Sequence, residues 1–222
     1  MTAYPTPDRR RFLEGAAALG LTAAGLAGFS ASAQAQANSS FPIDVMLAEG
    51  ALPDIWEGSK DAPISMVEYA SMTCPHCAAF HAQTYPALKK QYIETGKVRF
   101  VLREFPFDPL ATAGFMLARC TGPDKRAAMI DLLFAQQKNW AFSDKPFQGL
   151  STLVRQTGMS QDTFETCLKD QALYDNVNKV RDVGAQKFGV DATPTFFING
   201  KKVSGDTSID ELAKQFAPFL KG

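Results

Sequence analysis

Two cysteines separated by two residues carry the clearest chemical signal in this sequence. Cys74 and Cys77 enclose Pro75 and His76, follow an apolar run and open a helical pattern. The first cysteine is then expected at a helix N-terminus, where unpaired backbone N–H groups and the positive end of the helix dipole stabilise a thiolate. Because the thiolate is the form that attacks disulfides, the motif predicts a redox-active pair. We expect Cys74 to be the exposed nucleophile and Cys77 to be the buried resolving thiol.

Two ionisable residues near this pair are candidates for tuning its reactivity. His76 lies between the cysteines, where its imidazole can donate a hydrogen bond to the Cys74 sulfur; the alternative is a solvated histidine. Glu68 lies on an otherwise apolar segment, so its carboxyl could relay a proton to or from Cys77. The alternative for Glu68 is a strand-end glutamate that reaches solvent. We interpret His81, further along the expected helix, as structural.

A structural disulfide or a metal site is the alternative use of the same cysteines. A zinc site with four ligands usually has a second ligand pair nearby in the sequence, and none follows Cys77. A copper-binding stress protein would use the cysteines together with His76 and His81. A non-catalytic holdase would use an apolar face instead. We expect no cofactor and no metal at this site.

The first 37 residues have the pattern of a cleaved export signal. The basic run 9–11 precedes an apolar segment at 16–29, which is shorter than the about 20 residues that span a bilayer. Small residues suitable for cleavage follow at Ala33, Ala35 and Ala37. The order Arg-Arg-x-Phe-Leu resembles the twin-arginine signal, with an ordinary secretory signal as the alternative. We therefore expect the mature chain to work in the periplasm or an equivalent oxidising space.

The elements around the cysteines predict an α/β arrangement. We expect a strand at 64–69, then a helix at 74–92 that Pro86 should kink or divide, then a strand at 97–103. This β-α-β order puts the cysteines at the start of the helix. The preceding segment at 41–47 fits a strand or a short helix equally well.

A long helical stretch separates this unit from a second extended region. The stretch between 110 and 187 is too long for a crossover connection, so we expect an inserted helical subdomain. Two further strands are expected at 195–198 and 201–204 around the turn Asn199-Gly200, followed by a closing helix at 208–219. The five helices expected in the insertion are 111–120, 125–137, 147–157, 161–169 and 172–188.

These motifs resemble the DsbA family of periplasmic thiol–disulfide oxidoreductases, especially members whose helical insertion holds two further cysteines. The resemblance covers about residues 50–220 and rests on Cys-Pro-His-Cys, on Thr193-Pro194, on Glu68 six residues before the first cysteine, and on the insertion. It implies a thioredoxin fold with an inserted α-helical subdomain. The expected parts are a signal peptide at 1–37, an N-terminal leader at 38–60, a thioredoxin-fold domain formed by 61–109 and 188–222, and the helical insertion at 110–187.

The resemblance also implies partners and a role for the proline. A cis peptide bond before Pro194 would face the active-site cysteines, the alternative being an ordinary trans proline at a strand start. Substrates would be reduced exported proteins. A quinone-linked membrane oxidase of the DsbB type would recharge the pair. Equal numbers of basic and acidic residues, 23 of each, give no reason to expect nucleic acid.

The remaining cysteines, Cys120 and Cys167, are too far apart to form a redox motif. Both fall on expected helices of the insertion, and an oxidising compartment favours their pairing. We predict a structural or potential-tuning disulfide, which contributes roughly 3 to 4 kcal/mol in the chain-entropy model.

The direction of exchange stays open at this point. Thr193 stands where the best-known DsbA oxidants carry Val, whereas several isomerases and Gram-positive relatives carry Thr, so a disulfide isomerase or reductase is the alternative to an oxidase. Isomerases usually dimerise through an added N-terminal region, and only residues 38–50 are available for one. We therefore expect a monomer.

Overall fold

The computed structural model describes residues 39–205 and 207–220 of the chain. The expected signal peptide at 1–37 lies outside the described residues. Within the part of the chain that is described, no helix is both long enough and apolar enough to cross a membrane.

A four-stranded mixed sheet organises the fold, with the strand order β2-β1-β3-β4. The central strand β1 runs parallel to β2 and antiparallel to β3, and β3 pairs with β4 in an antiparallel hairpin. Glu68, in the middle of β1, lies opposite Leu102 on β2 and Phe196 on β3. The strands are β1 (Ile64–Ala70), β2 (Val98–Glu104), β3 (Thr195–Ile198) and β4 (Lys201–Ser204).

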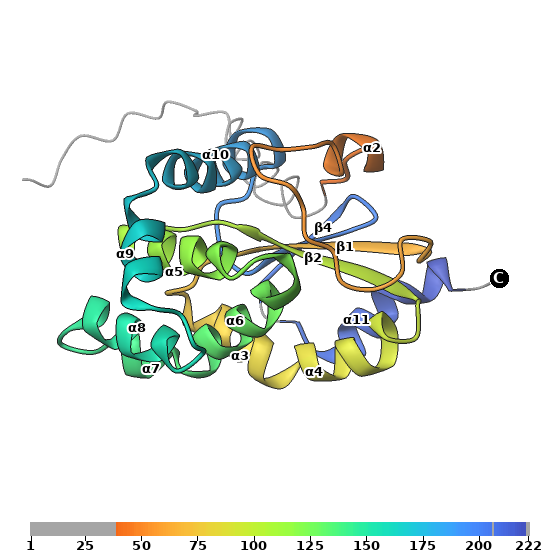
Figure 1. The fold of residues 1–222 in the computed structure, drawn as a ribbon. Helices are drawn as coiled ribbons and strands as arrows, with labels where there is room; N and C mark the ends of the chain where they lie inside the picture. Colours follow the sequence, from red (N-terminus) through yellow and green to blue (C-terminus); the bar gives the residue numbers. More distant parts are fainter. Residues whose placement is uncertain (1–38, 206, 221–222) are drawn as a thin grey trace, which may run out of the picture.

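Helices cover both faces of this sheet (Figure 1). Side chains alternate along β1, so Val67 and Tyr69 pack into one apolar cluster while Met66 and Ala70 pack into the other. By the same alternation, Glu68 points to the Met66 face. The first face carries α2 (Ile43–Met46) and α10 (Gln171–Phe188); the second carries α3 (Pro75–Gln83), α4 (Tyr85–Leu88), the π-helix η1 (Lys89–Ile93), and α11 (Ile209–Phe216) with the short 3₁₀ turn η2 (Ala217–Phe219).

The helix that carries the cysteines is shorter than the sequence predicts. The expected helix at 74–92 is divided after Gln83, where Thr84 has φ −103°. Pro86 follows in the first turn of α4; because proline has no N–H, it suits a helix start and not a helix interior. The second half of the expected helix is therefore a separate short turn that continues into the π-helix.

Five helices at one end of the sheet, followed by α10, connect β2 to β3 (Figure 1). Prolines at the first turn start three of them. The predicted end of the helix at 125–137 is wrong. The helix ends at Ala135, because Gln136 leaves the helical conformation, and a separate short helix begins at Gln137. The five helices are α5 (Pro109–Cys120), α6 (Pro123–Ala135), α7 (Gln137–Trp140), α8 (Pro146–Arg155) and α9 (Gln161–Lys169).

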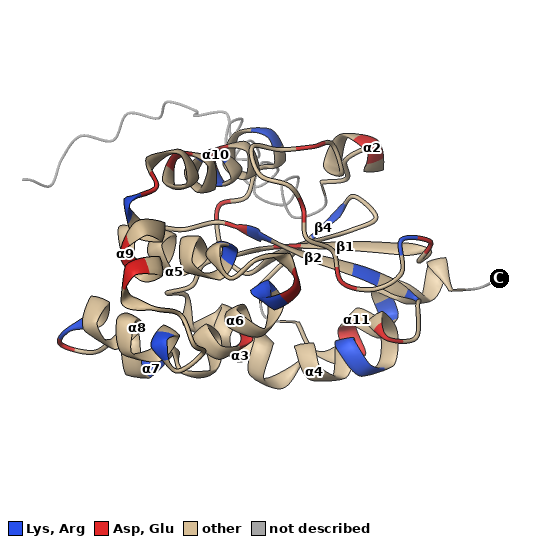
Figure 2. Cartoon of the chain, in the orientation of Figure 1, with Lys and Arg blue, Asp and Glu red and all other residues tan. Residues whose placement is uncertain are grey.

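A buried ion cluster fastens this helical region to the sheet. Glu104, the last residue of β2, accepts hydrogen bonds from Arg119 of α5 at 2.8 Å and from Arg126 of α6 at 2.7 Å. Burial alone would raise the pKa of this carboxyl, but the two guanidinium groups outweigh burial and lower its pKa to about 2. Elsewhere, residues of both charge signs are spread over the helices and strands (Figure 2).

Two glycines allow close backbone packing around the sheet. A Cβ on Gly184 would lie 2.8 Å from a ring carbon of Tyr69, so the absence of a side chain lets α10 approach β1. Gly200, with φ +87°, forms the β3–β4 turn beside the Phe41 backbone, where a Cβ would clash with the Phe41 carbonyl. The long helix α10 therefore packs directly on the sheet, although all of it except Phe188 falls within the range 110–187 expected for the insertion.

Candidate active site

The strand-to-helix junction places Cys74 at the start of α3. Cys74 has extended backbone angles, φ −83° and ψ 119°, and Pro75 occupies the first turn of the helix. Its carbonyl accepts a hydrogen bond from Ala78 N at 3.2 Å, which begins the helical ladder. Cys77 lies one turn further and is fully buried, whereas Cys74 is partly exposed. Only Cys74 is therefore open to a second molecule.

The surroundings of Cys74 favour its thiolate. The hydrogen bond from the Cys77 thiol lowers the pKa of Cys74, and partial burial opposes this. The nearby Thr193 side chain and the backbone N–H groups of Cys77 and His76 lower the pKa further, to about 5. These N–H groups belong to the first helical turn, where no backbone carbonyl is available to them. At neutral pH the reduced Cys74 is consequently a thiolate.

Cys77 has the opposite character. Burial raises the pKa of the Cys77 thiol well above its ordinary value, and both the hydrogen bond to Cys74 and the nearby charge of Glu68 raise it further. The two sulfurs thus differ in exposure and in proton affinity. The Cys74 sulfur is therefore suited to attack, whereas the Cys77 sulfur must bind a proton when the disulfide between them breaks.

The segment before β3 covers the cysteine pair. The peptide bond between Thr193 and Pro194 is cis, and the Thr193 carbonyl lies 3.2 Å from the Cys74 sulfur, where it can accept a hydrogen bond from the protonated thiol. Thr193 itself is buried, and its hydroxyl has no hydrogen-bond partner among the described residues. Residues 119 positions apart in sequence therefore meet at one sulfur.

Glu68 lies beneath the cysteine helix and does not reach solvent. Its side chain is fully buried, and Oε2 is 3.0 Å from Nε2 of His81 on α3. This excludes a solvent-exposed glutamate at a strand end. His81, interpreted from the sequence as structural, is thus the direct partner of the buried carboxyl.

His76 occupies an exposed position in the first turn of α3. The backbone N–H of His76 contributes to the low pKa of Cys74, and this contribution does not involve the imidazole. The role of the imidazole as a donor to the Cys74 sulfur stays a prediction. Within residues 39–205 and 207–220, no three His, Cys, Asp or Glu side chains are placed to hold a metal ion.

Residues from the helical region support the active-site loop and were not found from the sequence. The buried amide of Gln137, at the start of α7, donates to the carbonyls of Met72 and Cys74, each at 2.9 Å. Thr73 donates to Asp108 at 2.6 Å, and Asp108 also caps α5. A glutamine 63 residues from Cys74 carries no sequence signal for this contact.

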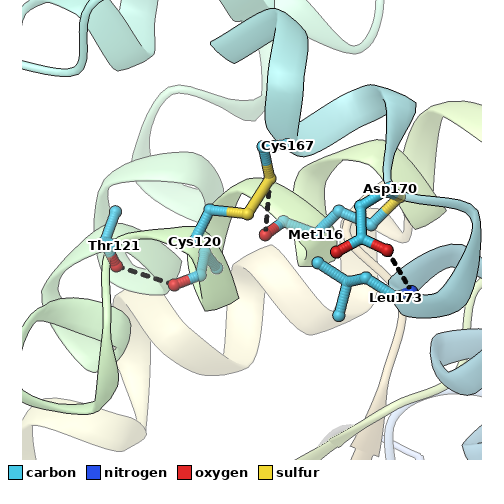
Figure 3. Close-up of a disulfide and its surroundings, with 7 residues drawn as sticks. Met116, Cys120, Thr121, Cys167, Asp170 and Leu173 are labelled. Carbon is cyan, nitrogen blue, oxygen red and sulfur yellow. Dashed lines mark hydrogen bonds between the residues drawn. A yellow bond between two sulfur atoms is a disulfide. The ribbon is translucent and has the colours of Figure 1, made fainter. Parts of the chain in front are cut away.

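A disulfide joins Cys120 to Cys167 within the helical region (Figure 3). Cys120 is the last residue of α5, and Cys167 lies near the end of α9, with the two Cα atoms 6.2 Å apart. The Cys167 sulfur is buried 3.2 Å from the Met116 carbonyl. Next to it, the Asp170 carboxylate caps α10 by accepting from Leu173 N at 2.9 Å.

The mixed sheet, the cysteines at the start of the first long helix and the cis proline beside them define a thioredoxin fold with an inserted helical region. The fold class predicted from the sequence is therefore confirmed. Comparison with known proteins agrees, since the family model described as "Thioredoxin" matches residues 51–216.

Individual relatives narrow this class. A Rickettsia typhi chain named "Putative protein-disulfide oxidoreductase" is 33% identical over 162 residues, which make up 72% of this chain and 60% of the relative. "Disulfide bond formation protein D" of Bacillus subtilis is 26% identical over 170 residues, or 74% of this chain and 76% of that protein. The crystal structure of Wolbachia pipientis alpha-DsbA1 superposes with a TM-score of 0.74 at 27% identity, covering 81% of this chain and 96% of that one.

The family model spans well over half of the chain, so the chain belongs to the thioredoxin family and is a DsbA-like member of it. The matched region spans about 60% of the length of the rickettsial relatives.

Proposed function

We propose that this protein is a thiol–disulfide oxidase that donates a disulfide to exported proteins through Cys74-Pro75-His76-Cys77. The observation that carries the proposal is the inequality of the two sulfurs: Cys74 is accessible with a pKa of about 5, and Cys77 is buried with a raised pKa. The names of the relatives from Rickettsia typhi and Bacillus subtilis support disulfide chemistry.

The proposed reaction starts from the oxidised pair. A substrate thiolate attacks the Cys74 sulfur, the Cys74–Cys77 bond breaks, and Cys77 leaves with the bonding electrons and takes up a proton. A second substrate thiolate then attacks the substrate sulfur of the mixed disulfide. This forms the substrate disulfide and releases Cys74 as a thiolate, so two electrons pass from the substrate to the cysteine pair.

The stabilised thiolate sets the direction in this proposal. A protein that stabilises its reduced form holds its disulfide weakly, and so the disulfide is a good oxidant of other thiols. In this scheme residues 61–109 and 188–222 carry the exchange, and residues 110–187 support and cover it.

The cellular setting is part of the same proposal. The export pattern at 1–37 supports a mature chain that works in the periplasm, with reduced exported proteins as its substrates. The DsbA-like family supports reoxidation by a quinone-linked membrane oxidase of the DsbB type. We propose that the mature protein works as a monomer.

The decisive experiment is the reduction potential of the Cys74–Cys77 pair, measured in glutathione buffers. We expect a value near the oxidising end of the thioredoxin superfamily, about −120 mV. A value near −270 mV, typical of thioredoxin, would overturn the oxidase proposal in favour of a reductase. A scrambled-disulfide refolding assay with the reduced protein separates an isomerase, which restores native pairings, from an oxidase, which does not. The control for this assay is Cys77→Ser, which lacks the resolving thiol and should therefore accumulate the mixed disulfide between Cys74 and the substrate.

A further inference from the structure

A solvent-accessible cavity lies beside His81 of the cysteine helix, and Cys74 does not line it. Its volume is about 530 Å³, and it is lined by residues of α3, α4, α6, β2 and the segment 55–57. His81 and Asp131 both line this cavity. Asp131 is half-exposed, with 45% of its side chain accessible, whereas 4% of the His81 side chain is accessible.

A row of polar groups leads from this cavity to the buried side of the active site. Oδ1 of Asp131 lies 3.6 Å from Nδ1 of His81, and Nε2 of His81 lies 3.0 Å from Oε2 of Glu68. The other carboxyl oxygen of Glu68 is buried without a hydrogen-bond partner among the described residues. Burial and the hydrogen bond to Cys74 raise the pKa of the Cys77 thiol, and the nearby charge of Glu68 raises it further.

The exchange reaction needs a proton at the buried sulfur of Cys77. When a substrate thiolate breaks the Cys74–Cys77 bond, the Cys77 sulfur leaves as an anion in a fully buried position. Because burial disfavours that anion, the sulfur must receive a proton as it departs. In the reverse direction, the same proton must be removed before Cys77 can attack.

We propose that His81 and Asp131 form the solvent end of a proton relay that passes through Glu68 to Cys77. This inference rests on the proposed disulfide exchange and deepens it. A proton moves from His81 Nε2 to Glu68 and from Glu68 to the leaving sulfur of Cys77, and His81 is reprotonated at Nδ1 from the cavity beside Asp131. His81 and Asp131 act through Glu68, so they are positioning residues for the proton transfer.

The groups that face His81 from the surrounding elements suit this role. Burial disfavours the charged imidazole, but Glu68 and Asp131 outweigh burial and raise the pKa of His81 to about 9. The imidazole therefore holds a proton at neutral pH. The ring is stacked on Phe134 of α6 at 4.4 Å between centroids and lies beside Tyr85 of α4 at 4.8 Å, which fixes its orientation.

The other charged groups of the cavity are engaged elsewhere. The Tyr85 hydroxyl donates to Glu57 at 2.7 Å, and Lys89 pairs with the same carboxylate at 3.2 Å. Arg126 bonds to Glu104, as described above. Asp124 lines the cavity from the first turn of α6, about two helical turns before Asp131 on the same face of the helix, and has no ion pair with His81. Asp124 is therefore a matched control for Asp131, on the same helix and in the same cavity.

The test compares Asp131→Asn with Asp124→Asn in the full chain. Each oxidised variant is mixed with excess reduced glutathione between pH 6 and 10, quenched with acid, alkylated and weighed by mass spectrometry. Rates are divided by the thiolate fraction of glutathione, so only the protein groups shape the profile. We expect Asp131→Asn to slow the reaction roughly fivefold near pH 10, where His81 is mostly deprotonated, and by less than about twofold near pH 8. Asp124→Asn should match the wild type at both values.

The pH profile distinguishes a relay from a structural contact. In the wild type the corrected rate should fall as pH rises through about 9, because His81 loses its proton there. Removing the negative charge of Asp131 lowers the pKa of His81, so the fall should move to lower pH, by roughly 0.7 unit. An Asp131→Asn profile that superimposes on that of Asp124→Asn overturns the proposal.

A second variant tests the histidine. His81→Gln can keep a hydrogen bond to Glu68 but has no proton to release, so it should react at least about tenfold more slowly near pH 7 and lose the fall near pH 9; a directly placed acid contributes about 10²- to 10⁴-fold. A rate within twofold of the wild type in a folded variant overturns the relay. The relay and the oxidase proposal can fail separately. The reduction potential of the Cys74–Cys77 pair decides whether the protein is an oxidase, whereas Cys77 gains or loses the same proton in either direction of exchange.

Discussion

The chain contains two pairs of cysteines, and the fold places them at opposite ends of helices. Cys74 precedes α3, so its sulfur meets the unpaired N–H groups of a first helical turn. Cys120 ends α5 and Cys167 lies in the last turn of α9, where the negative end of each helix dipole disfavours a thiolate. The first pair is free and carries a low pKa on one sulfur, while the second pair is joined in a disulfide.

This difference teaches that position on a helix, more than the presence of cysteine, separates reactive sulfur from structural sulfur. A thiolate at a helix start is both a better leaving group and an available nucleophile, so its disulfide is readily exchanged. A disulfide between two helix ends that is half-buried in a packed region lacks these features. It closes a loop of 47 residues and thereby restricts the unfolded chain.

The largest expected effect comes from Cys74. Replacing Cys74 by Ser should reduce disulfide donation to a reduced peptide to the uncatalysed level, because Cys77 is buried and unavailable for attack. The matched control is the double variant Cys120→Ala/Cys167→Ala, which should retain exchange. Loss of exchange in the control, with retention in Cys74→Ser, would reverse the roles assigned to the two pairs.

The second pair should instead matter for stability. The double variant Cys120→Ala/Cys167→Ala should lose about 4 kcal/mol of unfolding free energy, from the loop-closure entropy of the unfolded chain. Urea unfolding of the wild type and the variant, both with the Cys74–Cys77 pair oxidised, measures this difference. A loss below about 1 kcal/mol would show that the disulfide does not contribute through chain entropy.

The active-site pair should couple stability to pH. The pKa of Cys74 is lowered to about 5 in the reduced fold, against about 8.5 in an unfolded chain. The thiolate therefore stabilises the reduced fold fully above about pH 8.5, and this stabilisation is lost as pH falls towards 5. Between these values the folding equilibrium constant should change up to about tenfold per pH unit.

This coupling is measured best without the second disulfide. In the Cys120→Ala/Cys167→Ala background, only the Cys74–Cys77 pair changes redox state. The difference in unfolding free energy between the reduced and oxidised forms should grow in favour of the reduced form from pH 5 to pH 8. Thiolate absorbance near 240 nm should show a midpoint at about pH 5, and a midpoint near 8.5 would contradict the low pKa.

The smallest expected effect concerns the support that the helical region gives to the active-site loop. Gln137→Met keeps the buried volume but removes the two hydrogen bonds to the carbonyls of Met72 and Cys74, so it should cost about 1 to 2 kcal/mol. Asn139→Ala, exposed on the same short helix, is the control and should change stability by less than about 0.5 kcal/mol. Equal effects of the two variants would show that α7 does not hold the loop.

Much of the fold was predictable because its signals are local. The apolar run before Cys74, the proline after it and the Asn-Gly turn each favour one backbone conformation through nearby residues. Element ends were less predictable: the helix expected to end at Gln137 breaks at Gln136. The sequence also did not show where the inserted region ends. The helix α10 packs on the sheet through Val180, Phe188 and the close approach at Gly184, and these are tertiary contacts.

The sequence by itself determined the reactive motif and its place at a helix start, since the Cys77 side chain and the backbone N–H groups of His76 and Cys77, all within three residues of Cys74, lower its pKa. Only the tertiary structure decided which distant groups surround it. The Thr193 carbonyl meets the Cys74 sulfur across 119 residues, and the Gln137 amide reaches the same loop across 63. Likewise, His81 becomes the partner of Glu68 only when α3 packs on β1. Such contacts follow from how helices and strands pack, and residue spacing along the chain carries no record of that packing.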